Sequence, residues 1–189
     1  MATQALAVSV PTVGAYAVDP KRSTIKFETR HMFGLGKVSG TFAFRSGDLV
    51  IADPPSQSSA SAEVEAGSFS TGSGQRDKKV RSKAFLDVAS FPMITFRSER
   101  VRSDGETWVL VGTVTARGTS APIELRVTSA KTVSGNLAVT ATGSVDRYAH
   151  GIKAMKGMAA RRLHIEATIF ATSSEAVLLQ PPRAARRPS

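Results

Sequence analysis

Alternation of apolar and polar residues, repeated in short runs along most of the chain, is the feature that most limits how this sequence can fold. In the run 23–30, Ile25 and Phe27 alternate with Lys26 and Glu28, which is the period of a strand with one face in water. Similar runs occupy 38–45, 61–67, 93–101, 107–115, 122–129, 137–146 and 163–172. The pattern predicts about eight strands in an antiparallel sandwich or barrel, and alternation by itself does not separate those two architectures.

Two local features modify this all-β pattern. Ser46-Gly47-Asp48 has the composition of a turn, so we expect a hairpin between the run 38–45 and a further strand that begins at Leu49. Between Gln75 and Leu86 the apolar residues lose their alternation and β-branched residues are few, which predicts one short surface helix. A second helical turn is expected near Lys153.

Length and composition favour one domain. A chain of 189 residues, 41% of them hydrophobic, can bury a single sizeable core. We expect residues 1–15 to be a flexible segment and residues 174–189, rich in Pro and Arg, to be a disordered basic tail. Apolar runs fall far short of the roughly 18 residues that suggest a membrane span. Because no Lys or Arg lies within 1–15 to begin a signal peptide, we expect a cytoplasmic protein.

Most of the formal charge of +10 lies in two segments. The first basic stretch (76–83) holds five basic residues and one acidic residue, and the second basic stretch (147–162) holds five basic residues and no acidic ones. Clustered Arg and Lys suit a phosphate or pyrophosphate head group, but a solvated basic face explains them equally well. The charge also raises an alternative function, the binding of nucleic acid or anionic surfaces. Against it, the aromatic residues alternate toward the interior instead of lying on an exposed sheet.

Residues suited to catalysis are scarce. The chain has no cysteine, and its three histidines, His31, His150 and His164, lack the spacing of metal ligands. Nucleophile elbows, phosphate-binding loops and dinucleotide fingerprints are missing from the sequence. We therefore expect no enzyme, no metal and no cofactor, and we expect His164 to face solvent. The enzyme hypothesis depends only on His31 or on His150 beside the basic cluster.

An ordered series of short motifs resembles the YceI-like family and covers roughly 16–172. The series is Asp19, Ser23, Phe27 and His31; Gly40-Thr41-Phe42; Ser68 with Thr71-Gly72; Arg76-Asp77; Arg81-Ser82; Phe85-Leu86-Asp87; Phe91-Pro92; Thr95-Phe96-Arg97-Ser98; Gly112; Arg117-Gly118-Thr119 with Pro122; and Arg147 with Gly151. The resemblance implies an eight-stranded, lipocalin-like antiparallel barrel over 16–173. It also implies a homodimer, and an apolar tunnel that binds a polyisoprenoid or isoprenoid quinone.

This sequence departs from the family pattern in three places. Lys79 stands where the family commonly has histidine, and Val80 stands where leucine is usual. The segment 148–162 is also unusual, because relatives tend to carry an acidic or aromatic residue before the glycine and a longer polar loop. These departures leave the fold unaffected and leave the identity of the ligand open.

Candidate site residues follow from the presumed inward faces. The candidates for ligand binding are Phe27, Met32, Phe42, Phe44, Phe69, Phe85, Phe91, Phe96, Trp108, Gly143 and Met155. The candidates for a head group are Arg76, Arg81, Arg147 and Lys153. Ordinary core packing is the alternative for each aromatic residue. Small residues such as Gly40, Ala141 and Gly143 would leave room along the axis. We therefore expect a non-catalytic lipid-binding protein with no nucleic-acid partner.

Overall fold

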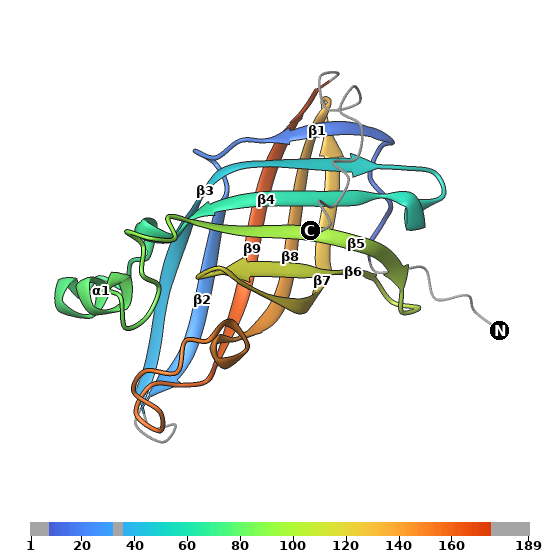
Figure 1. Ribbon diagram of the computed structural model, residues 1–189. Coiled ribbons are helices and arrows are strands. Elements are labelled where there is room, and N and C mark those ends of the chain that lie inside the picture. Colours follow the sequence, from blue (N-terminus) through green and yellow to red (C-terminus); the bar gives the residue numbers. More distant parts are fainter. Residues whose placement is uncertain (1–7, 32–35, 175–189) are drawn as a thin grey trace, which may run out of the picture.

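The computed structural model describes residues 8–31 and 36–174 (Figure 1). Its strands are β1 (Gly14–Val18), β2 (Thr24–His31), β3 (Gly36–Ile51), β4 (Ser59–Glu65), β5 (Met93–Ser103), β6 (Trp108–Ala116), β7 (Thr119–Val133), β8 (Asn136–Asp146) and β9 (Arg162–Ser173). One α-helix, α1 (Gly74–Arg81), and three 3-10 helices, η1 (Pro55–Gln57), η2 (Ala66–Ser68) and η3 (Arg147–His150), complete the elements of the described residues.

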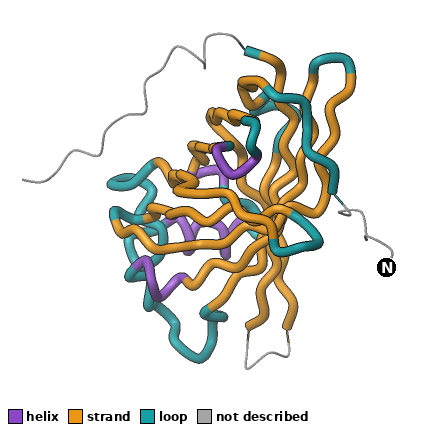
Figure 2. Tube along the Cα trace, turned by 90° about the vertical axis from the view of Figure 1, so that its right-hand side faces the viewer, coloured by secondary structure: helices purple, strands orange, loops and turns teal. Residues whose placement is uncertain are grey.

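Eight of the strands form a closed antiparallel barrel. They follow the order β3-β2-β9-β8-β7-β6-β5-β4, and β4 pairs back with β3 to close the ring. The short strand β1 pairs with both β3 and β9 and so bridges two strands of the ring. Figure 2, turned by 90°, shows a body made almost wholly of strands with loops and helices around it. The barrel prediction is confirmed, and closure is what removes exposed sheet edges.

Bulges bend the long strands around the barrel. β3 pairs with β2 through its first half and with β4 through its second, with a register shift between Phe44 and Ser46. The expected hairpin turn at 46–48 is therefore wrong, because these residues continue β3 through a bulge. A bulge bends a strand without ending its pairing. Gly47 is needed there, since a Cβ would lie 2.8 Å from the carbonyl oxygen of Ser61.

The prediction of one short helix within 75–86 is confirmed, and α1 begins one residue earlier, at Gly74. α1 ends at Arg81, and the N–H of Leu86 donates to the carbonyl oxygen of Val80 at 2.9 Å, which turns the chain back toward the barrel. Phe85 and Leu86 then become buried core residues instead of helical surface residues. Near Lys153 the chain makes turns, and the short helix of this region is η3, just before it.

The N-terminal segment differs from the expectation of a flexible arm. Residues 8–15 pack against the barrel: Val8 is buried against Val127 and Ala130, and the N–H of Thr12 donates to the hydroxyl of Thr132 at 3.1 Å. β1 was missed because its sequence is short and mostly apolar, so it shows no alternation. Residues 1–7, the candidate Met32, and 175–189 of the expected tail lie outside the described residues.

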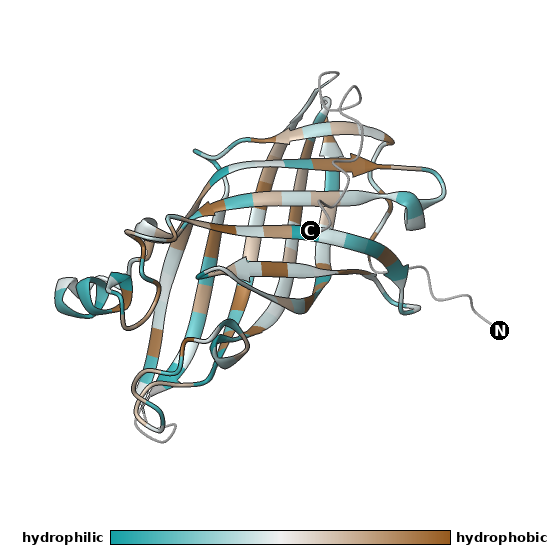
Figure 3. Ribbon diagram, in the orientation of Figure 1, coloured by the Kyte–Doolittle hydropathy of each residue, from teal (hydrophilic) through white to brown (hydrophobic). Residues whose placement is uncertain are grey.

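Inward and outward faces alternate along the strands, as Figure 3 shows by the change of hydropathy from residue to residue. The inward side chains form the core of the barrel. Among the described residues, no helix has the length and apolar character needed to cross a membrane. The end of the barrel that carries α1 and η3 is called the helical end below, and the end that carries Val8 and Trp108 is called the N-segment end.

Candidate ligand-binding cavity

A cavity of about 230 Å³ lies inside the barrel and receives side chains from all eight strands of the ring. Its aromatic lining residues are Phe42, Phe44, Phe69, Phe85 and Phe96, all of them predicted from the sequence. A second space of about 70 Å³ adjoins it at the N-segment end and shares Leu49, Ala60, Leu110 and Val139 with it. Trp108 lines this second space. An apolar interior of this shape suits one slim hydrophobic molecule.

Four predicted ligand-binding residues lie elsewhere. Phe27 is 1% exposed and packs against Phe42 and Phe69, with ring centroids 5.6 and 5.1 Å away, so it supports the wall instead of lining it. Phe91 precedes β5 and packs against the β6–β7 turn, where a Cβ on Gly118 would come within 2.8 Å of the Phe91 ring. Met155 packs on the outside of the cluster around Phe85. These positions stabilise the fold and do not border the cavity.

Gly143 is the fourth, and it does not leave room for a ligand. A Cβ at Gly143 would lie 2.7 Å from Cδ2 of Leu125 and 2.8 Å from the carbonyl oxygen of Glu124. The missing side chain therefore lets β7 approach β8. Gly40 plays a similar part, because its Cβ would lie 2.2 Å from the carbonyl oxygen of Ser70. Both glycines serve close backbone packing.

Two alanines supply the space that the glycines do not. Ala141 and Ala167 are cross-strand partners on β8 and β9, and both line the cavity. Sequence reasoning also missed most of the aliphatic wall, since it selected aromatic residues first. The alternation that predicts the strands also predicts which aliphatic side chains face inward. These inward residues include Ile25, Ile94, Leu110, Ile123, Val139, Ile165 and Ile169.

Arg147 is the charged side chain at the helical end of the cavity. It is 6% exposed and lines the interior, and it belongs to η3 directly after β8. Its guanidinium donates to the carbonyl oxygens of Ala160, Ile152 and Ala159 at 2.7, 2.7 and 2.9 Å. Burial lowers the pKa of Arg147 from its usual value. The side chain thus fastens the segment 152–160 to the barrel.

The other three head-group candidates lie outside the cavity. Arg76 is exposed on α1 and donates to the hydroxyl of Thr71 at 3.2 Å, and Lys153 is exposed. Arg81 donates to the carbonyl oxygen of Phe69. Asp77 is buried and accepts from the N–H and hydroxyl of Thr71 at 3.0 and 2.6 Å, so it secures the loop before α1.

The two basic stretches meet at the helical end. Phe85, which follows the first stretch, packs with Ile152 of the second in one buried cluster. Arg117 links them further, because its guanidinium donates to the carbonyl oxygens of Lys83 and Gly151 at 3.0 and 3.4 Å. Figure 1 shows α1 and the segment after β8 on the same side of the barrel. Both basic stretches therefore lie at the helical end of the barrel.

The histidines divide into a buried one and an exposed one. His150 is 3% exposed, lines the cavity, and places Nδ1 2.9 Å from the carbonyl oxygen of Thr119. His164 is exposed on β9, as predicted. The side chain of His31 lies outside the described residues. Within the described chain, no group of three or more His, Cys, Asp or Glu residues could hold a metal ion.

A closed antiparallel barrel with an apolar interior and one short helix defines a protein of the lipocalin-like class. The YceI-like domain model matches residues 16–171, and the chain belongs to this family. UPF0312 proteins of Yersinia pestis (strain Pestoides F) and Enterobacter sp. (strain 638) are 31% identical over 113 residues, which is 58% of this chain and 58% of each of those relatives.

Solved structures give the same fold. BcnA of Burkholderia cenocepacia matches with a TM-score of 0.74 and 20% identity over 82% of this chain and 99% of its own. A structure from Saccharophagus degradans, described as a polyisoprenoid binding domain implicated in plant cell wall breakdown, matches with a TM-score of 0.64 and 13% identity. That match covers 86% of this chain and 100% of the other. The resemblance to the family is thereby confirmed.

Proposed function

We propose that this protein is a non-catalytic binding protein that holds a polyisoprenoid or an isoprenoid-quinone-like lipid along the barrel axis. The observation that carries the proposal is the apolar cavity of about 230 Å³ inside a closed barrel. Membership of the YceI-like family supports it, as does the similarity to a polyisoprenoid binding domain. The large aromatic residues line this interior, which argues against a stacking surface for nucleic acid.

Burial of apolar surface suffices for useful affinity. Ten methylene-like groups of a prenyl chain contribute about 8 kcal/mol at about 0.8 kcal/mol each. That free energy corresponds to a dissociation constant of about one micromolar before the costs of association. Selectivity for chain length then depends on the depth of the cavity, which Trp108 and Leu49 limit at the N-segment end.

The decisive experiment identifies what the protein carries. Native mass spectrometry of protein purified from its source, followed by organic extraction, should show a prenyl lipid at one copy per chain. The same spectra report whether the protein is the homodimer that we propose. Protein that carries no lipid and takes up none of a series of prenyl compounds would contradict the proposal.

A pair of variants on β8 tests where the lipid lies. Ala141→Phe places a large ring in the cavity and should abolish prenyl binding, because Ala141 lines the interior. Ala138→Phe is the matched control: it is the same substitution on the same strand, on the opposite face. We expect it to bind normally. Equal binding by both variants would show that the lipid does not occupy the cavity.

The head group is the finer part of the proposal. We place it at the helical end, where Arg76 and Lys153 are exposed near the rim. Replacing both by Glu should weaken a prenyl pyrophosphate, more so at low salt, and leave a neutral quinone almost unaffected. Arg100→Glu with Lys131→Glu, exposed residues on β5 and β7, is the control of equal charge. An equal response to both pairs would show that net charge matters and the rim does not.

A further inference from the structure

His150 lies between the interior of the barrel and a cleft on its outer side. The cleft has a volume of about 290 Å³ and is lined by residues 121–123 of β7 and 144–146 of β8, among others. The cleft and the interior cavity share Val114, Ile123, Val145 and His150 in their walls. The imidazole therefore forms part of the wall that separates the cavity from this cleft.

The hydrogen bond at Nδ1 fixes the tautomer of His150. Nδ1 lies 2.9 Å from the carbonyl oxygen of Thr119, and a carbonyl oxygen only accepts. Nδ1 must therefore carry a proton. In the neutral imidazole, Nε2 is then a bare acceptor. This acceptor is the chemical property that His150 offers to whatever lies beside it.

Nε2 is accessible and has no hydrogen-bond partner in the part of the chain that the structure describes. Among the described residues, none forms a hydrogen bond with it, and the fully enclosed polar side-chain atoms without a partner are Arg81 Nε and Trp108 Nε1. Nε2 is not one of these enclosed atoms, although the whole residue is only 3% exposed. His150 lines both the cavity and the cleft, so an accessible acceptor on its ring is satisfied when a donor occupies the space beside it.

Arg147 supplies donors on the same side of η3. Residues three apart in a 3-10 helix lie on one face, and Arg147 and His150 are so spaced and both line the cavity. Three N–H groups of Arg147 are used by carbonyl oxygens, which leaves two of the five that a guanidinium carries. This end of an otherwise apolar cavity thus offers an acceptor and donors together.

We propose that His150 determines specificity by accepting a hydrogen bond at Nε2 from a hydroxyl group of the ligand, so that the favoured ligand is a prenyl chain ending in an alcohol. A hydroxyl donates to Nε2 while its oxygen remains free to accept. An ether or quinone oxygen only accepts, so it could take a remaining N–H of Arg147 but would leave Nε2 without a donor. The inference rests on the proposed lipid-binding function and adds the chemical class of the head group.

Competition between geranylgeraniol and its methyl ether tests this proposal. The two compounds are mixed in equal amounts with the protein, and their bound ratio is read by native mass spectrometry. The protein should favour the alcohol by about tenfold. His150→Phe keeps a ring of similar size and should lower the ratio to near one while still binding the ether.

The possible results are distinct. A ratio near one in the unaltered protein, or a preference that survives in His150→Phe, overturns the role of His150. If His150→Phe binds neither compound, ¹⁵N-histidine spectra of the unaltered protein decide: the Nε2 resonance should move with the alcohol and not with the ether, and any other result overturns the inference. Failure of the unaltered protein to bind either compound overturns the proposed function itself, and this inference with it.

Discussion

The two ends of the barrel are closed in different ways. At the N-segment end, Val8 packs on Val127 and Ala130, and Tyr16 and Leu137 are buried in a neighbouring apolar cluster. At the helical end, the cluster of Phe27, Phe69, Phe85, Leu86 and Ile152 is joined by the buried charge of Arg147. One end is closed by apolar packing, whereas the other combines apolar packing with hydrogen bonds from a guanidinium.

This difference gives the cavity a direction. Arg147 and His150 line the interior at the helical end, and both basic stretches meet at that end. The adjoining space at the N-segment end is lined mainly by apolar side chains, including Trp108 and Val10. A ligand with one polar end would therefore enter with its hydrocarbon toward the N-segment end. Substitutions at each end test this difference.

Removing Arg147 should damage the helical end most. Arg147→Met keeps much of the side-chain volume but leaves three carbonyl oxygens without their donor, so we expect a loss of about 3 to 5 kcal/mol in the free energy of unfolding. Urea denaturation measures it. Arg147→Lys keeps the charge but lacks the forked donor geometry, and it should recover only part of the loss. A loss under about 1 kcal/mol for Arg147→Met would show that the guanidinium does not hold this end.

At the N-segment end, Val8→Asp should cost about 2 to 3 kcal/mol, because it buries a carboxylate among apolar side chains. Val8 is 4% exposed, whereas Val13 in the same segment is 59% exposed. Val13→Asp is therefore the control and should change stability by no more than about 0.5 kcal/mol. Thermal or urea unfolding of both variants gives the comparison. Similar values for the two would mean that Val8 does not seal this end.

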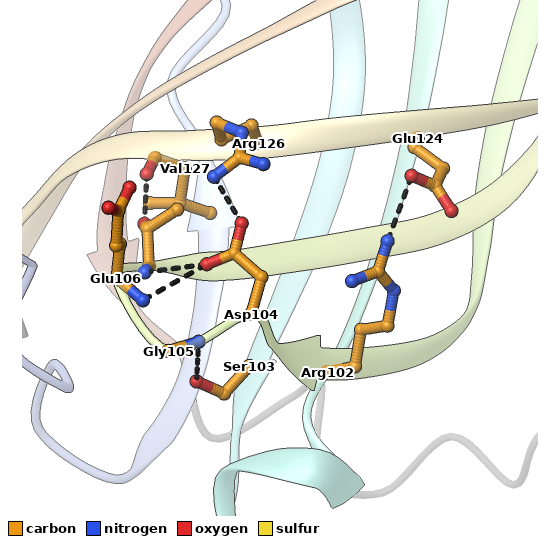
Figure 4. A network of polar contacts seen from close by, with 9 residues as sticks. Arg102, Ser103, Asp104, Gly105, Glu106, Glu124, Arg126 and Val127 are labelled. Carbon is orange, nitrogen blue, oxygen red and sulfur yellow. Dashed lines mark hydrogen bonds and ion pairs between the residues drawn. The ribbon is translucent and has the colours of Figure 1, made fainter.

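Each end also has a carboxylate whose pKa is lowered. The N–H of Thr107 holds the pKa of Asp104 below its usual value, with help from Glu106 N–H and the Arg126 guanidinium (Figure 4). A hydrogen bond from Arg161 does the same for the pKa of Asp146. A lowered folded-state pKa stabilises the protein above the unfolded value of 3.8, and that contribution is lost as the pH falls through the folded pKa.

Asparagine variants test this acid sensitivity. Asp104→Asn and Asp146→Asn should each be less stable than the unaltered protein at pH 7, and the difference should shrink as the pH falls below 3.8. Unfolding curves at a series of pH values show the trend. If the difference stays constant down to pH 2, titration of these carboxylates does not contribute.

The smallest effect is expected for the surface ion pair of Arg102 on β5 and Glu124 on β7. Its atoms are 2.9 Å apart, but the two side chains are 42% and 58% exposed (Figure 4). Arg102→Ala should lower stability by under about 1 kcal/mol, and less in high salt because exposed pairs are screened. A larger loss that persists in high salt would mean that the side chain acts through packing.

The sequence by itself determined the strands, the place of the helix and the family. Alternation such as that of Ile25 and Phe27 reveals a strand because each side chain faces the opposite side from its neighbour. The same signal led to an error at Ser46-Gly47-Asp48, since a bulge and a turn use similar residues. It missed β1, whose residues are buried on both faces at the junction of β3 and β9.

Only the tertiary structure decided which residues border the cavity. Phe27 and Phe42 belong to the same inward pattern, yet Phe42 lines the cavity together with Phe69, whereas Phe27 lies behind these two rings and supports the wall. Gly143 and Ala141 lie on one face of β8. Only the close approach of β7 shows that the space beside Gly143 is already occupied and is not open to a ligand. Periodicity reports the direction of a side chain, whereas the cavity depends on what segments far apart in the sequence bring against it.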